Sequence, residues 1–197
     1  MSDAPPDEGA LVAALRRGER AALDVVYDRY RPRVFAFLAR MTRDRLVAED
    51  LLQDTFVRLA QRAAYLAADT RLRPWLFTVA RNLALDHRRR QLLDFDRLDE
   101  LATWPTPRRE ERSPFVHLEA SETERRLEAA LATLPAPERE AVLLVAVEGL
   151  APAEAAEVLD LQGPTLRKRL SRGRKRLAAA LDPDRARPAL RPVKVHR

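Results

Sequence analysis

The chain has 197 residues, of which 46% are hydrophobic and only five are glycine, and its abundance of Ala, Leu, Arg and Glu predicts an all-α protein. Because it has no cysteine and no apolar run of membrane-spanning length, the sequence excludes disulfide bonds, thiolate metal sites and membrane insertion, and it suits a reducing cytoplasm. The net charge of +6 is uneven, since residues 161–197 hold twelve Lys and Arg against two Asp, and this favours a polyanionic partner at the C-terminal end.

The first half of the chain has a dense helical period. Residues 1–9 are acidic and proline-rich, so we expect a disordered leader there. An N-terminal domain over 10–90 follows, with helices predicted over about 10–17, 19–41, 45–66 and 74–90. Asp69 and Thr70 interrupt the apolar period, which predicts a loop before the fourth helix.

The helix predicted over 45–66 carries a small acidic patch. The 100° step per residue places its apolar positions on one side and four other residues together on the opposite side. These four residues, called the acidic patch below, are Asp50, Gln53, Asp54 and Val57. The patch fits a basic partner helix, although an ordinary solvated helix face has the same pattern, and the residues alone leave both interpretations open.

The helix predicted over 74–90 has a face suited to nucleic acid. Trp75, Asn82, Asp86 and Arg89 share one side of it, and together they offer a stacking surface, an amide for base edges and a cation for phosphate. The alternative places Trp75 in the core and pairs Asp86 with an arginine on the surface.

The stretch over 91–119 contains three prolines and two charge clusters without a sustained period, so we expect a flexible linker between two small helical domains. Its acidic run consists of Asp94, Asp96, Asp99 and Glu100. A C-terminal domain over 120–181 follows, with a capping box at Ser121 and Glu124 and a helix end at Gly149. The basic tail over 182–197 is expected to be disordered.

The last predicted helix combines a narrow apolar stripe with seven cations. The stripe consists of Leu166, Leu170, Gly173, Leu177 and Leu181, and the cations cover the rest of the circumference. A glycine on the buried side indicates close approach of another helix. The short helix before it completes a helix-turn-helix, whose second helix enters the major groove of DNA. A basic amphipathic helix on a membrane or an acidic partner is the alternative.

Three motifs in order resemble those of bacterial extracytoplasmic-function (ECF) sigma factors: AEDLLQDTF, then RPWLFTVARNLALDHRRR, then LPAPEREAVLLVAVEGLAPAEAAEVLDLQGPTLRKRLSRGRKRL. The resemblance covers about residues 10–90 and 120–181. It implies a non-catalytic initiation subunit without cofactor or metal, which is cytoplasmic and joins the nucleoid in the holoenzyme. The implied partners are core RNA polymerase (the β′ clamp helices and the β subunit), promoter DNA and an anti-sigma factor.

The resemblance also implies roles for individual residues. The acidic patch (Asp50, Gln53, Asp54 and Val57) would bind the clamp helices, and the linker would thread the polymerase channels. The residues implied for the −10 element are Asp69, Thr70, Trp75, Asn82, Arg88 and Arg89. Those implied for the −35 element are Thr165, Arg167, Lys168, Ser171, Arg172 and Lys175.

Several residues depart from the family pattern. Lys168 and Ser171 stand at base-reading positions where the family has other residues, so the −35 sequence is not inferable. Ala151 stands where a serine would cap a helix, which costs about 1 kcal/mol. A stand-alone helix-turn-helix regulator is the alternative function, but no dimerisation heptad is present and the acidic patch would be unexplained. An enzyme has little support without paired catalytic side chains.

Overall fold

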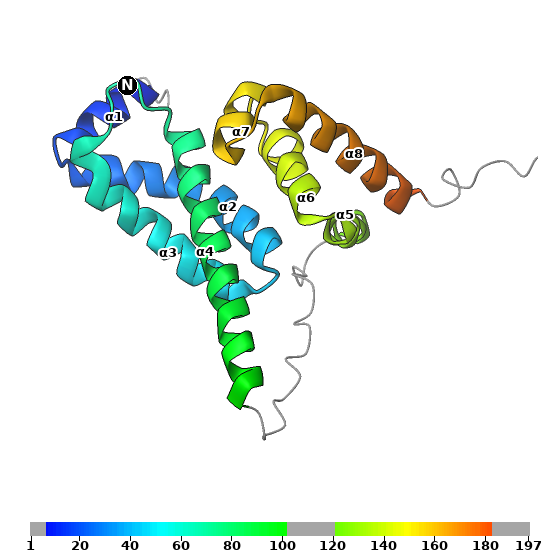
Figure 1. Cartoon of the computed structure of the whole chain (residues 1–197). Helices are drawn as coiled ribbons and strands as arrows, with labels where there is room; N and C mark the ends of the chain where they lie inside the picture. Colours follow the sequence, from blue (N-terminus) through cyan, green and yellow to red (C-terminus); the bar gives the residue numbers. More distant parts are fainter. Residues whose placement is uncertain (1–6, 102–120, 183–197) are drawn as a thin grey trace, which may run out of the picture.

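The structure, a computed structural model, describes residues 7–101 and 121–182, with side chains described for all of these except residues 94–101. Every regular element in these ranges is a helix, which confirms the predicted all-α class. The helices form two groups that lie side by side, and α4 lies at the boundary between them (Figure 1). The leader up to residue 6, residues 102–120 of the expected linker, and the tail from residue 183 lie outside the described residues.

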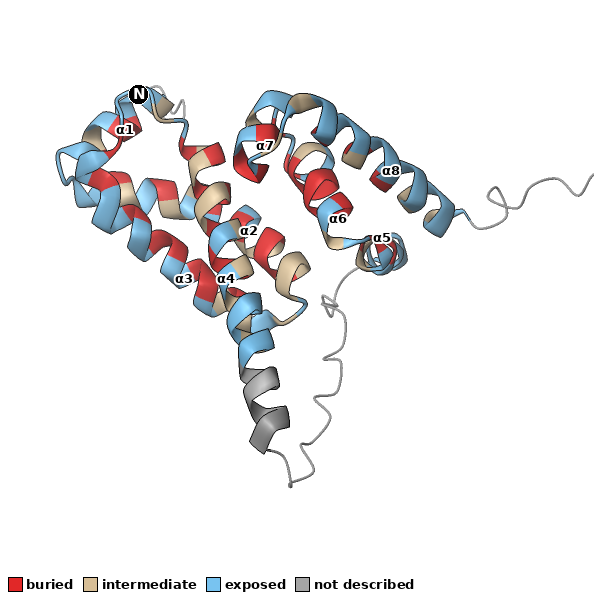
Figure 2. Ribbon diagram, viewed as in Figure 1, coloured by how far each residue is buried: buried red, intermediate tan, exposed pale blue. Residues whose placement is uncertain are grey.

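The N-terminal domain comprises α1 (Glu8–Arg16), α2 (Arg20–Thr42), α3 (Arg45–Arg62), the short 3-10 helix η1 (Ala63–Tyr65) and α4 (Leu72–Leu101). Helices α2, α3 and α4 pack against one another, and α1 packs against α2 and η1. At the centre, the fully buried rings of Phe37 and Phe77 meet edge to face with centroids 5.2 Å apart. The buried faces of these helices point toward this common core (Figure 2).

A tight turn between α2 and α3 fixes two helix ends at once. Arg43 closes α2 with a left-handed backbone (φ 58°). The carboxylate of Asp44 then accepts hydrogen bonds from the backbone N–H of Leu46 at 3.0 Å and of Val47 at 3.3 Å, which caps α3. The predicted boundary, between a helix that ends near residue 41 and one that begins near residue 45, therefore agrees closely with the structure.

The fourth helix is longer than predicted, because α4 continues from Arg90 to Leu101 through the first part of the expected linker. This part has no proline and is rich in Leu, a good helix former, so the helix continues through it. Leu92 and Leu93 are both exposed, which is why no amphipathic period marked the extension. The acidic run from Asp94 to Glu100 falls on this helix, but its side chains lie outside the described residues.

The C-terminal domain comprises α5 (Glu122–Thr133), α6 (Ala136–Val142), the π-helical turn η2 (Leu143–Val147), α7 (Pro152–Leu159) and α8 (Gly163–Leu181). The predicted capping box is present, since Ser121 N–H donates to Glu124 Oε2 at 2.7 Å and Glu124 N–H donates to Ser121 Oγ at 3.2 Å. The helix expected to end at Gly149 finishes in the wider turn η2, and Gly149 follows it with φ 66°.

Helices α7 and α8 form the predicted helix-turn-helix. Ala155 and Ala156 are buried in α7, and Asp160 closes that helix in the left-handed conformation. At Ala151 only half of a capping box exists, because its N–H donates to Glu154 Oε2 at 2.9 Å while its methyl group offers no acceptor. In α8 the stripe is confirmed: Leu166, Leu170 and Gly173 are buried and Leu177 is half-buried.

The two domains are in direct contact through polar pairs. Arg40 of α2 pairs with Glu128 of α5 at 2.6 Å, and Arg81 of α4 pairs with Glu140 of α6 at 2.8 Å. Helix α4 also packs against α7. A flexible linker does not by itself predict this docking, because the partners are distant in sequence.

We expect Gly173→Val to destabilise the C-terminal domain, because a Cβ there would lie 2.7 Å from Val142 Cγ2 and 3.2 Å from the carbonyl oxygen of Glu138. Overpacking of this kind costs about 1–3 kcal/mol, more than the few tenths gained in helix propensity. Urea unfolding followed by circular dichroism measures the loss. Ala179→Val, on the exposed side of the same helix, is the control and should change stability by less than about 0.5 kcal/mol. Equal effects of the two substitutions would contradict the close approach.

Candidate nucleic-acid interface and neighbouring surfaces

Helix α8 presents its predicted DNA-binding residues on one exposed surface. The buried stripe docks α8 against α6, α5 and α7, so the opposite side faces solvent. All six predicted residues are exposed: Thr165, Arg167, Lys168, Ser171, Arg172 and Lys175. Arg176 differs from them because it pairs with Glu138 at 2.9 Å within the domain. Cations displayed along an exposed helix of a helix-turn-helix suit contacts with phosphates and base edges.

A groove runs beside this surface between α7 and α8. Its volume is about 940 Å³, and its lining includes Ala153, Ala156, Arg167 and Ser171. Two of the residues predicted for the −35 element, Arg167 and Ser171, therefore line a groove that also has apolar walls.

The acidic patch on α3 is exposed at all four positions: Asp50, Gln53, Asp54 and Val57. The apolar positions Ala48, Leu52, Phe56 and Leu59 are buried on the other side, as the period predicts. Val57 is 51% exposed, and Leu46, one turn before Asp50, is 61% exposed. The patch is therefore a row of acidic and amide groups with an exposed apolar side chain at each end. The sequence alone did not indicate that Leu46 is exposed, because a leucine at the start of an amphipathic helix is normally expected in the core.

The loop before α4 brings two predicted residues together and adds one that was missed. Thr70 and Trp75 line a hollow of about 270 Å³ together with Tyr65 of η1. Tyr65 is 83% exposed, and Trp75 is half-buried against the core, so part of the indole remains accessible at the hollow. Tyr65 was not predicted, although an aromatic residue at the end of a helix and beside a polar loop could have indicated it.

The remaining predicted residues on α4 divide between two faces. Asn82 and Arg89 are exposed, and Arg89 Nη1 lies 3.5 Å from Asp86 Oδ1, which is the surface pairing considered from the sequence. Arg88, although next to Arg89, lines a pocket between the two domains. The structure therefore does not gather the six residues Asp69, Thr70, Trp75, Asn82, Arg88 and Arg89 on a single surface.

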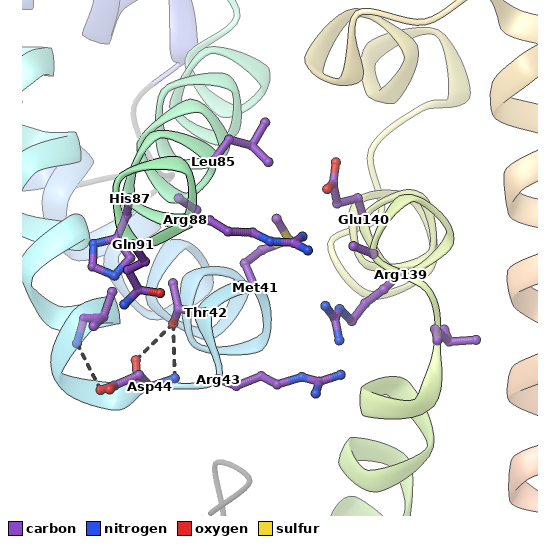
Figure 3. A pocket seen from close by; sticks show the side chains of 14 residues that line it. Met41, Thr42, Arg43, Asp44, Leu85, His87, Arg88, Gln91, Arg139 and Glu140 are labelled. Carbon is purple, nitrogen blue, oxygen red and sulfur yellow. Dashed lines mark hydrogen bonds between the residues drawn. The ribbon is translucent and has the colours of Figure 1, made fainter. Parts of the chain in front are cut away.

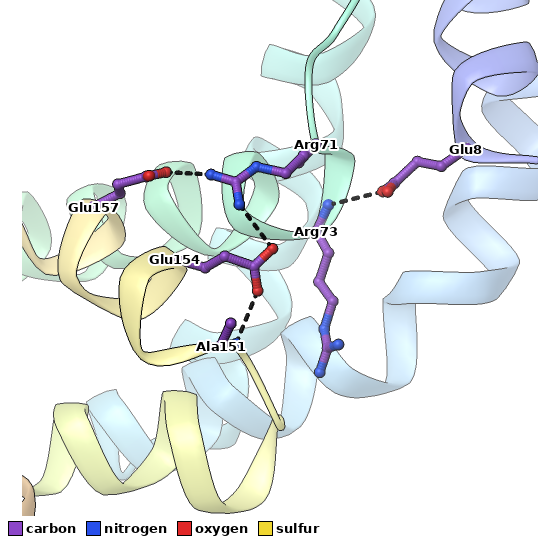
Figure 4. A network of polar contacts seen from close by, with 6 residues as sticks. All are labelled: Glu8, Arg71, Arg73, Ala151, Glu154 and Glu157. Carbon is purple, nitrogen blue, oxygen red and sulfur yellow. Dashed lines mark hydrogen bonds and ion pairs between the residues drawn. The ribbon is translucent and has the colours of Figure 1, made fainter.

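Arg71, next to the predicted DNA-binding loop, is held by the C-terminal domain. Its guanidinium pairs with Glu154 at 3.0 Å and also with Glu157, both on α7 (Figure 4). The carboxylate of Glu154 also accepts the N–H of Ala151, so the cap of α7 and the interdomain contact share one side chain. The position of this loop is thus linked to the docking of the C-terminal domain.

Glu148 is a buried acid at the domain boundary, with 5% of its surface exposed. Burial raises the pKa of its carboxyl group above the ordinary value, and the positive charges of Arg33, Arg40 and Arg73 only partly oppose this rise. All three arginines belong to the N-terminal domain, so the environment of Glu148 is completed by contact between the domains.

Within residues 7–101 and 121–182, no group of three or more His, Cys, Asp or Glu side chains is placed to hold a metal ion. In the same ranges, none of the helices combines the length and the apolar character needed to cross a membrane.

Known proteins share both halves of this fold. The family models for Sigma-70 region 2 and Sigma-70 region 4 match residues 26–92 and 124–177. RNA polymerase sigma factor CarQ of Myxococcus xanthus is 33% identical over 84% of this chain and 92% of its own. ECF RNA polymerase sigma factor SigM of Bacillus subtilis is 32% identical over 80% of this chain and 93% of its own.

Solved structures match as well. CnrH, solved with the cytosolic domain of CnrY, aligns with a TM-score of 0.66 and 25% identity over 90% of this chain and 98% of its own. The sigma factor RpoE of Bartonella quintana, solved with the anti-sigma factor NepR, aligns with a TM-score of 0.65 and 26% identity over 78% of this chain and 92% of its own.

We expect Glu148 to make stability depend on pH. Because its pKa is raised in the folded protein, its stabilising contribution is fully present below the ordinary glutamate value of 4.5 and is lost as the pH rises through the raised pKa. Glu148→Gln should therefore gain stability relative to the wild type as the pH increases above 4.5. Urea unfolding at several pH values measures this difference, with Glu122→Gln, at an exposed position of α5, as the control. If the free energy of unfolding of the wild type and of Glu148→Gln changed in parallel with pH, Glu148 would not be the source of the pH dependence.

Proposed function

Because this chain belongs to the ECF sigma factors, alternative and non-catalytic subunits that direct transcription initiation, we propose which of its surfaces bind RNA polymerase and promoter DNA. The stand-alone helix-turn-helix regulator is set aside, since both sigma regions are matched in order along one chain. The observation that carries the proposal is the separation of an exposed acidic patch on α3 from an exposed basic surface on α8.

The basic surface of α8 binds the −35 element. Its first turns carry Arg167, Lys168 and Ser171, which reach base edges when the helix lies in the major groove. Arg172 and Lys175 lie further along the same exposed side and hold the DNA backbone.

The hollow at Tyr65, Thr70 and Trp75 receives an unstacked base of the −10 element. An exposed tyrosine next to a half-buried indole offers the aromatic faces on which single-stranded bases stack. Asn82 supplies an amide for a base edge, and Asp69 lies in the same loop. Arg89 is exposed on the following turns, where it contacts the backbone.

The acidic patch binds the clamp helices of the β′ subunit, and further contacts reach the β subunit. Exposed acids flanked by Leu46 and Val57 combine charge complementarity with apolar anchors that lose water on docking. The resulting holoenzyme is cytoplasmic and associates with the nucleoid.

The domains separate when both promoter elements are bound. The −10 and −35 elements lie about 25 base pairs apart, roughly 85 Å of duplex. A compact chain of this length has a radius of gyration of about 16 Å, so docked domains cannot reach both. Separation breaks the pairs of Arg40 with Glu128 and of Arg81 with Glu140. Arg88, which is exposed and lines the pocket between the domains, then contacts the DNA backbone.

A protein that holds the factor inactive is a further partner. RpoE of Bartonella quintana, similar to this chain over most of its length, was solved with an anti-sigma factor, which supports a partner of that class here.

Run-off transcription on a pool of bacterial promoter fragments tests this function. Purified core polymerase with this protein should initiate at fragments that share one pair of sequence elements. Core polymerase alone, on the same pool, is the control. Initiation that does not depend on this protein would refute the proposal.

Two substitution sets should separate the two surfaces. Replacing Asp50, Gln53 and Asp54 together by Ala should weaken core binding about tenfold or more, because a charged interface loses its complementary groups. The recognition-helix variant Arg167→Ala/Lys168→Ala should keep core binding and lose promoter-specific initiation. Asp24→Ala/Asp28→Ala, at exposed positions of α2, controls for the lost charge. If the acidic-patch variant bound core polymerase as tightly as the wild type, the proposal that this patch binds the polymerase would be wrong.

The salt dependence of holoenzyme binding to a selected promoter checks groove docking. If Arg167 and Lys168 both neutralise phosphates, the slope of log K against log salt concentration should fall by about 2 in the double alanine variant. Arg16→Ala/Arg20→Ala, on exposed positions of the N-terminal domain, removes the same charge elsewhere and should leave the slope unchanged. A slope that is equal in all three proteins would contradict groove docking.

A further inference from the structure

A pocket between the two domains has a lining that none of the surfaces above explains. Its volume is about 400 Å³, and it lies between the α2–α3 turn, α4 and the start of α6 (Figure 3). Both domains supply its walls, so the pocket exists only while they are docked. Apart from Arg88, no residue of the proposed DNA and polymerase surfaces lines it.

Three guanidinium groups converge on this pocket. Arg43 reaches it from the end of α2, Arg88 from α4 and Arg139 from α6 (Figure 3). The two acids in the lining are engaged elsewhere: Glu140 accepts the hydrogen bond of Arg81 at 2.8 Å, and Asp44 caps α3. The pocket therefore has an excess of positive charge.

Arg139 carries the strongest sign of a missing partner. It is 8% exposed, and its Nε and Nη1 atoms are buried without a hydrogen-bond partner among the described residues. Burial lowers the pKa of this guanidinium, and the charges of Arg43 and Arg88 lower it further, while Glu140 opposes them. A buried cation with unused donors beside two like charges is costly unless an anion accompanies it. His87 Nε2, in the lining of the same pocket, is likewise buried with no hydrogen-bond partner in the part of the chain that the structure describes.

We propose that this interdomain pocket binds a small molecule bearing two or more phosphate groups. Guanidinium groups pair with phosphate oxygens through two parallel hydrogen bonds, and the volume suits a small ligand. Three cations gathered in so small a space match a compact group with several charges better than carboxylate side chains, which bring one charge each. Arg139 provides the donors from the C-terminal domain, and Arg88 and Arg43 provide those from the N-terminal domain. Arg43 Nη2 also donates to the carbonyl oxygen of Ala132, so the remaining nitrogens of its guanidinium face the ligand.

Such a ligand stabilises the docked arrangement, because it binds residues of both domains and loses the partners from one of them when the domains separate. On the proposed function, it also competes with promoter DNA for Arg88. The binding site itself does not depend on that function.

Isothermal titration calorimetry of the full chain with inorganic tripolyphosphate tests the site, at an ionic strength matched with sodium chloride. We expect one tight site and an affinity that falls about tenfold or more in Arg139→Gln, because charge-assisted hydrogen bonds are lost. Arg172→Gln, which removes the same charge from the exposed side of α8, is the matched control and should keep the tight site. Equal affinity of the wild type and Arg139→Gln, or loss only in Arg172→Gln, would overturn the proposal.

Circular dichroism checks that Arg139→Gln is folded. If it is not, Arg88→Gln replaces it, since Arg88 is exposed and its loss leaves no buried gap. A glutamate-rich peptide is the competing ligand: Arg139-dependent binding of the peptide without binding of tripolyphosphate would also overturn the proposal.

Domain docking gives an independent readout. Because the chain has no cysteine, thiols introduced by Gln61→Cys and Ala179→Cys can be labelled with a fluorescent donor and acceptor. Tripolyphosphate should raise energy transfer in this protein and leave it unchanged when Arg139→Gln is added. An identical response with and without Arg139→Gln would count against the pocket as the bridging site.

Discussion

The ion pair of Arg81 with Glu140 is the most deeply buried of the ion pairs that join the two domains in the part of the chain that the structure describes. Both side chains are largely buried, with 15% and 6% of their surfaces exposed. A buried pair gains little net stability, because removing two charges from water costs nearly as much as their attraction returns. The attraction requires the partners to meet in one geometry, whereas separation returns both to water. The pair therefore specifies how the domains dock without making the docked state hard to leave.

Helix α4 connects the docking of the two domains with the surfaces proposed to bind DNA. One of its faces completes the N-terminal core through Leu76, Phe77 and Ala80, and a second face carries Arg81 and Arg88 toward the C-terminal domain. The side that remains exposed presents Asn82 and Arg89. Helix α4 thus contributes to the core, to the interdomain contact and to an exposed surface. Docking of the C-terminal domain engages Arg81 in an ion pair and places Arg88 in the lining of the interdomain pocket.

Two buried charges stand at the boundary that this docking creates. Glu148 brings a carboxyl group of the C-terminal domain among arginines of the N-terminal domain, and Arg139 brings a guanidinium beside two others. Each is costly in the docked state unless a proton or an anion neutralises it. The interface is accordingly sensitive to its ionic surroundings, and polar interfaces of this kind are where relative domain motion is expected.

Patterns among residues close in the sequence were enough to predict many features of this protein. The all-α class, the capping box at Ser121, the stripe of α8 and the acidic patch of α3 each depend on residues within about four positions of one another, and the sequence displays such relations directly. The extension of α4 beyond Arg90 was not predicted, because the sequence there shows no sustained apolar period. Tertiary structure alone decided that Arg88 lines the pocket between the domains while Arg89 pairs with Asp86, and that Tyr65 joins Trp75 at one hollow. It also decided that Arg139 is buried with two guanidinium nitrogens that have no hydrogen-bond partner among the described residues. These outcomes depend on which distant surfaces meet, and a helical period shows that a face will be buried without naming what will cover it.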